Sequence, residues 1–421
     1  MISKIPLLFL ILLSAHLGFA QSPSVGAIRW DAWTGSNNSV GIQVEQALSP
    51  GKYHYRVPFF GVELDTGTVK IDGTTQSIMD QEIDYAKYAG LNYWAFVWYA
   101  AASGLDEARK LYYSSTKKSL IDYCLIIDQS FFIKDISINQ IIQEFHDASY
   151  FKVLDGRPLL YFIGYSGLVV ADIDSLRARS IAAGAGNPYI VELRVDGKLN
   201  VVDDLHMDAF GMYATSWISH GVPYHDLANA DISQWDYIGN TNHKKVVPHV
   251  TTGWDARPIH DHPFTWYPDP GPDSWVQMAT AKEIANHMQE ALNWVNANPT
   301  IAEANTILVY AWNEHAEGGW LCPTLSNYGY TERIDSLNAI LNPATFTKKE
   351  SVEKESFLIY PNPTKNKICL SQSNNVSWSL KNLYGVEILK GNDLVCDMSS
   401  LANGVYIISI DNKNFRVIKF K

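Results

Sequence analysis

The stretch that decides the fold spans residues 306–320 and reads TILVYAWNEHAEGGW. Its first four residues are apolar or β-branched, the pattern of a strand buried on both faces of a parallel sheet. Two carboxylates, Glu314 and Glu317, stand at the exit of that strand and are bracketed by Trp312 and Trp320. Acidic and aromatic side chains directly after a buried strand predict a reaction site at this point of the chain.

Paired carboxylates beside aromatic rings suit the hydrolysis of a glycosidic bond. One carboxyl group moves protons, the second manages charge at the anomeric carbon, and the rings pack against sugars. On a helical turn, Cβ atoms three residues apart are roughly 5–6 Å from each other, close to the ~5–5.5 Å carboxyl separation of retaining glycosidases, so the spacing predicts retention. Burial beside Trp312 and Trp320 is expected to raise the pKa of the acid. The alternative is that both acids only cap a helix.

Seven further apolar runs precede this strand, with amphipathic stretches such as 77–89 and 274–297 between several of them. Eight strands that alternate with helices predict an α/β fold, a (β/α)8 TIM barrel over residues 24–342. A doubly wound open sheet is the alternative, and it is disfavoured because no glycine-rich loop follows the first strand. The predicted strands are Val25–Trp30, Tyr93–Trp98, Tyr123–Ile127, Pro158–Ile163, Tyr189–Leu193, Ala209–Tyr213, Lys245–Val250 and Ile307–Ala311.

Polar and aromatic residues follow most of these strands, where the C-terminal face of a barrel carries its chemistry. Each has a structural alternative: Asp128 in a helix cap, Arg257 in an ion pair, Trp98 in the core. Their recurrence at successive strand exits favours contact with substrate. The predicted catalytic residues are Glu314 and Glu317, and the predicted substrate-binding residues are Trp30, Trp33, Trp98, Tyr99, Asp128, Glu192, Tyr213, Trp254, Asp255, Arg257, Trp312, Asn313 and His315.

The N-terminus predicts export. Residues 1–20 contain an early lysine, an apolar core and small residues before Gln21, the pattern of a cleavable signal peptide. No cysteine follows the expected cleavage point, which argues against a lipid anchor, and no other apolar run approaches membrane-spanning length. We therefore expect a secreted protein, or one attached to the outer-membrane surface.

Charge and metal-ligand spacing exclude several classes of partner. The net charge of −11 disfavours nucleic acid and anionic membranes. The histidines are scattered without metal-ligand spacing, so neither a metal nor a cofactor is expected. Four cysteines do not make a disulfide scaffold, and whether Cys369 and Cys396 pair is left open by the sequence.

Beyond Pro343 the composition changes. Residues 343–356 are polar and charged and predict a linker, and residues 357–421 show short alternating runs that predict a small all-β sandwich. The segments Tyr360–Thr364, Leu401–Ile410 and Lys419–Lys421 resemble the type IX secretion C-terminal sorting domain of Bacteroidota. That resemblance implies the type IX secretion machinery as a partner. A carbohydrate-binding β-module is the alternative for this region.

Within residues 24–342, five segments resemble glycoside hydrolase family 99 and the related family 71/99-like and WbsX-like proteins. The W-N-E-x-x-E-G element, Trp312–Gly318, is the most specific of them. The resemblance implies a (β/α)8 barrel of retaining endo-acting glycosidases, with α-mannosidic linkages as the founding substrates. The segments, in chain order, are Gly26–Trp33, Tyr85–Trp94, Tyr150–Leu160, Gly253–Pro258 and Ala311–Gly318.

The resemblance also implies roles for the two glutamates. Glu314 matches the base that takes the proton of the sugar 2-hydroxyl, which then displaces the leaving group through a 1,2-anhydro sugar. Glu317 matches the acid that protonates the leaving oxygen and later activates water. The chain departs from the family pattern at residues 30–31, at His315, where tryptophan is usual, and at residues 322–324. Mannoside specificity is therefore not carried over.

Alternatives remain for His315 and for the whole barrel. A loop histidine with satisfied hydrogen bonds is favoured over one that binds substrate or tunes Glu314. For the protein, the expected function is a secreted glycoside hydrolase that acts on a polysaccharide or oligosaccharide. The alternatives are a non-catalytic surface glycan-binding protein on the same barrel and, more weakly, a glycan-assembly protein.

Overall fold

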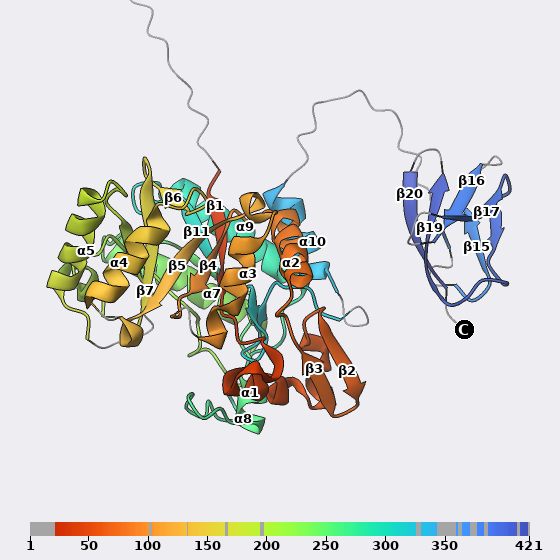
Figure 1. Cartoon of the computed structure of the whole chain (residues 1–421), viewed down its shortest axis with the longest axis horizontal. Helices are drawn as coiled ribbons and strands as arrows, with labels where there is room; N and C mark the ends of the chain where they lie inside the picture. The colour runs from red at the N-terminus through yellow and green to blue at the C-terminus, as the bar shows by residue number, and fades with distance from the viewer. Residues whose placement is uncertain are drawn as a thin grey trace, which may run out of the picture. The chain divides into compact units, whose positions relative to one another are not determined.

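The computed structural model of the protein describes residues 22–100, 103–132, 134–164, 167–193, 198–325, 330–342, 359–360, 364–370, 377–382, 386–410 and 413–419. The chain divides into two compact units, residues 1–344 and 345–421 (Figure 1). The predicted signal peptide, 1–20, and the predicted linker, 343–356, lie outside the described residues.

The first unit is a nearly closed parallel barrel, as the sequence predicts. Its strands follow the order β10-β11-β1-β4-β5-β7-β8-β9, and β6 (Lys152–Val153) pairs antiparallel with β7. An isolated parallel bridge between Phe210 and Val246 joins the two end strands, because Val247 N–H donates to the Phe210 carbonyl at 2.7 Å. The strands are β1 (Ser24–Arg29), β4 (Tyr93–Val97), β5 (Asp122–Asp128), β7 (Arg157–Ile163), β8 (Tyr189–Leu193), β9 (Ala209–Gly211), β10 (His249–Thr251) and β11 (Thr306–Tyr310).

Side chains fill the interior of the barrel. The Tyr93 hydroxyl shares hydrogen bonds with Tyr161 at 2.9 Å and Thr306 at 3.0 Å, which joins three strands that are not neighbours in the sheet. Gly26 on β1 makes room for this layer, since a Cβ there would lie 2.2 Å from the Tyr93 ring. The barrel is thus a packed core with no central pore, as is usual for this fold.

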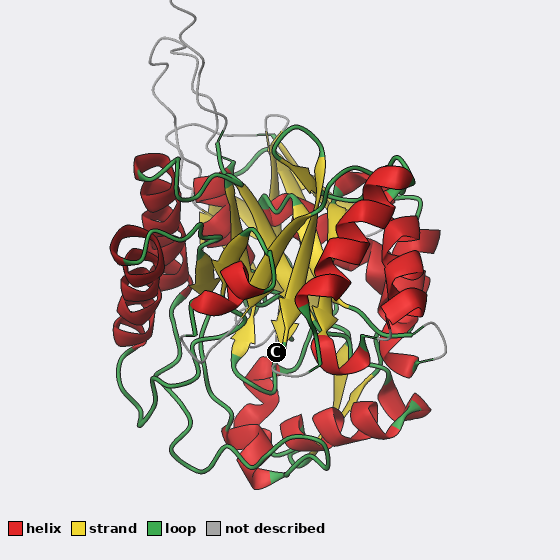
Figure 2. Cartoon of the chain, turned by 90° about the vertical axis from the view of Figure 1, so that its left-hand side faces the viewer, coloured by secondary structure: helices red, strands yellow, loops and turns green. Residues whose placement is uncertain are grey.

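Helices surround the strands (Figure 2). Local signals set their ends: Thr75 caps the start of α2, Gly90 ends it at φ 92°, and Thr280 and Glu283 form a capping box on α9. None of the described helices is long and apolar enough to cross a membrane. The surrounding helices are α2 (Gln76–Ala89), α3 (Glu107–Ser114), α4 (Lys134–Phe145), α5 (Val170–Ala182), α6 (Asn200–Asp204), α7 (Tyr224–Trp235), α9 (Ala281–Ala297) and α10 (Glu332–Leu341).

Insertions after β1 and β10 cover the carboxyl ends of the strands. They contribute α1 (Ser39–Leu48), the hairpin of β2 (Gly61–Asp65) and β3 (Thr68–Ile71), and α8 (Arg257–Asp261). In Figure 1 these elements lie together below the barrel, and α1 packs against both β3 and α8. The remaining short helices are η1 (Gly35–Asn37), η2 (Gly51–Arg56), η3 (Gly104–Asp106), η4 (Lys118–Leu120), η5 (Gln129–Phe131) and the π-helical η6 (Asp236–Thr241).

The second unit is all-β, as predicted. One antiparallel sheet has the order β14-β15-β18 and the other β17-β16-β19-β20, around a core that includes Trp378, Leu380 and Ile408. Cys369 faces Val395 and Cys396 faces Ile368 in the strand register, and both cysteines are free thiols. The strands are β14 (Ile359–Tyr360), β15 (Lys367–Leu370), β16 (Trp378–Lys381), β17 (Glu387–Gly391), β18 (Val395–Asp397), β19 (Gly404–Ile410) and β20 (Lys413–Lys419).

Candidate active site

Glu314 and Glu317 lie on a tight hairpin that follows β11. The strands β12 (Asn313–Glu314) and β13 (Gly319–Trp320) pair antiparallel, and Glu317 N–H donates to the Glu314 carbonyl at 3.1 Å. The helical turn assumed for their spacing is therefore wrong, and so is the helix-cap alternative. A β-turn still brings its first and fourth residues together, because their Cα atoms lie within about 7 Å.

Two glycines allow this hairpin to fit against the barrel. Gly318 has φ +88°, and a Cβ there would lie 2.4 Å from the backbone nitrogen of Asp255. A Cβ on Gly319 would lie 2.3 Å from the ring of Tyr310. Any side chain at these two positions would push the turn away from its neighbours, so the glycines fix where the glutamates point.

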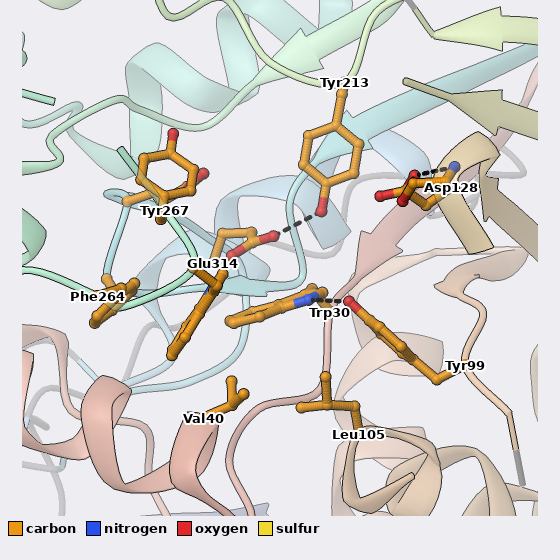
Figure 3. Close-up of a pocket in the computed structure, with 13 residues that line it drawn as sticks. Trp30, Val40, Tyr99, Leu105, Asp128, Tyr213, Phe264, Tyr267 and Glu314 are labelled. Carbon is orange, nitrogen blue, oxygen red and sulfur yellow. Dashed lines mark hydrogen bonds between the residues drawn. The ribbon is translucent and has the colours of Figure 1, made fainter. Parts of the chain in front are cut away.

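Glu314 is held by a tyrosine hydroxyl. The Tyr213 hydroxyl donates to Glu314 Oε1 at 2.6 Å, and the glutamate is only 5% exposed (Figure 3). Burial raises the pKa of Glu314 well above its usual value, and the neighbouring charge of Glu317 raises it further. The hydrogen bond from Tyr213 opposes this shift.

Glu317 has two phenolic partners. The Tyr310 hydroxyl donates to Glu317 Oε2 at 2.5 Å, and Tyr267 forms a second hydrogen bond to the same carboxyl group. Burial raises the pKa of Glu317, while both hydrogen bonds lower it. Burial raises the pKa of Tyr310, and the Glu317 charge raises that of Tyr267, so both phenols stay protonated and donate. The pair is thus surrounded by neutral donors.

A pocket of about 520 Å³ opens over the two glutamates. Among the residues that the structure describes, its lining contains three carboxylates, Asp128, Glu314 and Glu317, and no lysine, arginine or histidine. The rest of the wall is mainly aromatic and aliphatic, which suits the apolar faces of sugar rings. The other lining residues are Trp30, Val40, Tyr99, Leu105, Ser130, Tyr213, Phe264, Trp266, Tyr267 and Ala316.

The structure brings four predicted substrate-binding residues to this pocket, each from a strand exit: Trp30, Tyr99, Asp128 and Tyr213. The Trp30 indole N–H donates to the Tyr99 hydroxyl at 2.8 Å, which joins two walls (Figure 3). Asp128 also accepts from Ser130 N–H at 2.8 Å, so it caps η5 while it lines the pocket.

Four predicted aromatic or amide residues lie behind the pocket instead. Trp312 has no exposed surface and donates to Glu82 Oε1 at 2.9 Å. Asn313 accepts from Trp30 N–H at 3.0 Å and donates to Asp31 at 3.1 Å. Trp33 donates to the Asn313 carbonyl, and Trp98 is buried outside the pocket wall. Trp33, Trp312 and Asn313 support the hairpin through these hydrogen bonds, and none of the four residues lines the pocket.

Four further predicted residues serve packing or ion pairs. The Trp254 indole donates to Ser274 Oγ at 3.0 Å, and Glu192, with no exposed surface, accepts from Gln129 at 3.2 Å. Arg257 forms two hydrogen bonds to Asp255, at 2.8 and 2.7 Å, and stacks on the Trp275 ring. Asp255 also pairs with the buried Arg56. None of these four predicted residues lines the pocket.

His315 is fully buried beneath the turn and does not line the pocket. Its Nδ1 lies 2.6 Å from the Arg56 carbonyl, and its ring stacks against Trp320. Its Nε2 is buried without a hydrogen-bond partner. The expectation of a histidine with satisfied hydrogen bonds therefore holds for Nδ1 and is wrong for Nε2. Burial lowers the pKa of His315 to about 3, which keeps the ring neutral. Trp320 therefore packs on His315, not on the acids it was expected to cover.

Sequence reasoning missed four aromatic residues of the site. Tyr310 is the last residue of β11 and reads as core, yet its hydroxyl reaches Glu317. Phe264, Trp266 and Tyr267 come from the loop after α8. Their clustering between the last two barrel strands was the signal that could have identified them. Within the described ranges, no group of three or more His, Cys, Asp or Glu is suited to hold a metal ion.

The second unit matches a known family. Residues 358–420 match the family model described as a secretion system C-terminal sorting domain. The tail is a sorting domain. This match confirms the resemblance predicted for the tail, and it implies secretion machinery as a partner and export as the destination. A comparison of the sequence with curated proteins gives no match.

The barrel has the fold of glycoside hydrolase structures. The GH99 endo-α-mannosidase from Bacteroides thetaiotaomicron in complex with Bis-Tris propane has a TM-score of 0.51 and 15% identity, over 76% of this chain and 97% of that chain. A second structure of the GH99 enzyme from that species has a TM-score of 0.49 and 14% identity, with 76% and 96% covered. The first likeness supports the predicted barrel fold.

Proposed function

We propose that the protein is an exported retaining glycoside hydrolase that acts on a glycan of uncharged sugars, with Glu314 and Glu317 as its catalytic pair. The observation that carries the proposal is the pair itself: a buried and a partly buried carboxylate on one β-turn, both hydrogen-bonded by phenols and lining an aromatic pocket. Burial and mutual repulsion keep one carboxyl group protonated above its usual range, as an acid–base pair requires.

In the first step the Glu314 carboxylate takes the proton of the sugar 2-hydroxyl, and that oxygen bonds to the anomeric carbon. The bond to the leaving oxygen breaks, and Glu317 gives its proton to that oxygen. In the second step Glu317 takes a proton from water, whose oxygen opens the 1,2-anhydro ring at the anomeric carbon. Glu314 then returns its proton to the 2-oxygen. Two inversions at one carbon give retention.

In this scheme the proton of the pair lies on a different glutamate in the empty site than in the occupied site. In the empty site burial and the neighbouring Glu317 charge raise the pKa of Glu314 well above its usual value, which favours the proton there. A bound sugar that donates its 2-hydroxyl to Glu314 stabilises the ionised form of that carboxyl group. A leaving oxygen that accepts from Glu317 stabilises the protonated form of the other. Bound substrate therefore lowers the pKa of Glu314 and raises the pKa of Glu317, which is the order that catalysis needs.

The pocket wall favours uncharged sugars. Among the described lining residues, three carboxylates with no cationic side chain beside them would repel a uronic acid or a sulfate ester. Trp266 is 40% exposed and stacks on Phe264 with ring centroids 4.7 Å apart, which presents a flat apolar surface at the rim. Such surfaces suit sugar rings. An α-mannan is the first substrate to test, since the GH99 structures are of endo-α-mannosidases.

The sorting-domain match of the tail supports a reaction outside the cell. A type IX secretion route carries the protein through the periplasm and across the outer membrane, and the sorting domain is removed or used for surface attachment. Polymeric glycans are available there, whereas nucleotide-sugar donors are not. A role in glycan assembly is therefore disfavoured.

The decisive experiment compares wild type with Glu314→Gln and Glu317→Gln on α-mannan and on a panel of other neutral glycans. We expect each variant to lose at least a thousandfold of activity, roughly what removal of one member of a catalytic unit costs. NMR of the first-formed anomer should give retention. Glu107→Gln, which changes a carboxylate on α3 that is 39% exposed and lies outside the pocket, is the control. Full activity of both Gln variants, or an inverted product, would refute the mechanism.

A non-catalytic glycan-binding protein is the alternative. It gains nothing from two neighbouring carboxylates that repel each other, and it would bind equally well when both are made neutral. Binding of the intact glycan by the Glu317→Gln variant, together with no product from wild type, would favour that function.

A further inference from the structure

The barrel contains a second pocket, of about 360 Å³, which shares no lining residue with the active-site pocket. It lies where the start of α10 meets the segment before α9 and the end of the catalytic hairpin. Arg333 of α10, Met278 and Trp320 are among its lining residues. We call it the Arg333 pocket.

Arg333 differs from every other arginine that the structure describes in the barrel. Seven of those arginines have a carboxylate within 4.0 Å: Arg29, Arg56, Arg109, Arg157, Arg177, Arg179 and Arg257. Arg333 has none among the described residues. In a chain of net charge −11, a partly buried cation without an acidic partner among the described residues is the exception, and it stands in the wall of a cavity.

The hydrogen bonds of Arg333 leave part of its guanidinium unused. Its Nη1 donates to the carbonyls of Trp320 at 2.7 Å and Thr252 at 3.3 Å, and its Cζ lies 3.6 Å from the centre of the Trp320 ring. Among the described residues, neither Nε nor Nη2 has a partner. These two nitrogens form the edge of the planar fork that binds carboxylates and sulfates with two parallel hydrogen bonds.

The rest of the pocket is compatible with a small anion. Tyr55, Tyr330 and Thr280, whose side chains carry hydroxyl groups, are among its lining residues. Glu332 is its one acidic lining residue, and that side chain is exposed to water, where its charge is screened. Burial lowers the pKa of Arg333 to about 9, which still leaves it charged at neutral pH, and an anionic ligand would relieve that strain on the cation.

We propose that the Arg333 pocket is a binding site for a small oxyanion, a carboxylate or sulfate group, held by the free edge of the Arg333 guanidinium. The site is separate from the catalytic pair and does not depend on the hydrolase proposal. The oxyanion has two sources, an inorganic ion or an acidic saccharide such as a uronic acid. A structural role alone, in which Arg333 only braces the Trp320 carbonyl, leaves the two nitrogens unexplained.

The test is isothermal titration of the full chain, at low salt, with sodium sulfate, glucuronate and, as the neutral control, glucose. Met278 is 61% exposed on the pocket rim, so it can be changed without disturbing the core. We expect Met278→Glu to weaken sulfate and glucuronate binding at least roughly fivefold relative to Met278→Gln, since the two side chains differ only in charge. Arg333→Lys, which keeps the charge but loses the fork, should weaken both roughly tenfold.

The two sources separate by affinity. Tighter binding of glucuronate than of sulfate identifies an acidic saccharide, and the reverse order identifies an inorganic ion; either supports the site. Equal affinities for Met278→Glu and Met278→Gln, or no binding by wild type, would overturn it. So would a large change in anion affinity in Glu317→Gln, because the anion would then lie in the active-site pocket.

Discussion

Acidic side chains lie both on the catalytic hairpin and against it, and the two kinds have opposite kinds of partner. Asp255, beneath the turn, is bound by the guanidinium groups of Arg56 and Arg257. Glu314 and Glu317, above the turn, are held by the hydroxyls of neutral tyrosines. A guanidinium keeps a carboxylate ionised, whereas a phenol lets it take a proton. The difference separates a structural acid from one that can exchange protons.

The largest effect should come from removal of Arg56, the buried partner of Asp255. Arg56→Met leaves Asp255 buried with only its outer partner and removes the donor to the Asp255 carbonyl at 2.8 Å. We expect a loss of about 3–5 kcal/mol of unfolding free energy, measured by urea denaturation, because removal of the buried partner leaves a buried charge that Arg257 compensates only in part.

Arg257→Met is the matched control, since it removes the other partner of the same carboxylate. Its side chain is 35% exposed, so we expect a loss of less than about 1 kcal/mol. Equal effects of the two substitutions would show that burial does not distinguish the two ion pairs.

The second-largest effect should come from a substitution in the turn, which tests whether the turn positions the tyrosine partner of Glu317. Gly319→Ala places a methyl group 2.3 Å from the Tyr310 ring, which must then move and carry its hydroxyl away from Glu317. We expect kcat to fall at least tenfold, because the loss corresponds to about the free energy of one hydrogen bond to a charged group. Gly67→Ala, in the open turn between β2 and β3, is the control and should leave kcat unchanged.

A smaller effect should separate the roles of the two glutamates. Tyr213→Phe removes a hydrogen bond that lowers the pKa of Glu314, and Tyr267→Phe removes one that lowers the pKa of Glu317. If Glu314 is the base, Tyr213→Phe should move the acidic limb of the pH–rate profile to higher pH. If Glu317 is the acid, Tyr267→Phe should move the alkaline limb upward. Exchanged effects would reverse the assigned roles.

The smallest effect concerns a third kind of carboxylate, Asp231, which lies between two imidazoles. His249 and His287 contact it at 2.8 and 3.0 Å. The hydrogen bond to Asp231 raises the pKa of His287 against the effect of burial, and the histidines lower the pKa of Asp231. Stabilisation by His287 is complete below its unfolded pKa of about 6.5 and is lost as pH rises through the higher folded value.

The Asp231 contribution has the opposite sign. It is present above the unfolded pKa of about 3.9 and is lost as pH falls toward the lower folded value. Urea midpoints should therefore be highest between about pH 4 and 6.5. His287→Asn should flatten the alkaline side of this curve, and an unchanged slope in that variant would contradict the assignment.

The barrel could be predicted because its signal is local. Each buried strand is a continuous apolar run, and all eight expected runs overlap a strand or, at 245–247, the bridge that closes the barrel. The residues of the site were harder to predict, because residues at strand exits point either into the pocket or under the hairpin. The sequence does not distinguish Tyr213, which reaches Glu314, from Trp254, which packs below it.

The turn and the loop partners escaped prediction for a different physical reason. The E-x-x-E spacing is equally good for a helix and for a β-turn, and only the contacts of Gly318 and Gly319 with the barrel decide between them. Tyr267 reaches Glu317 from a segment some fifty residues away, a proximity that no local pattern encodes.

The pocket is assembled from two kinds of chain segment, and this has a consequence for how specificity can change. The glutamates and Tyr310 belong to the barrel and its last hairpin, whereas Val40, Phe264 and Trp266 belong to insertions after β1 and β10. Insertions at strand ends tolerate changes in length and sequence that a barrel strand does not. One reaction centre can therefore be given to different glycans by exchange of two surface segments, with the chemistry left in place.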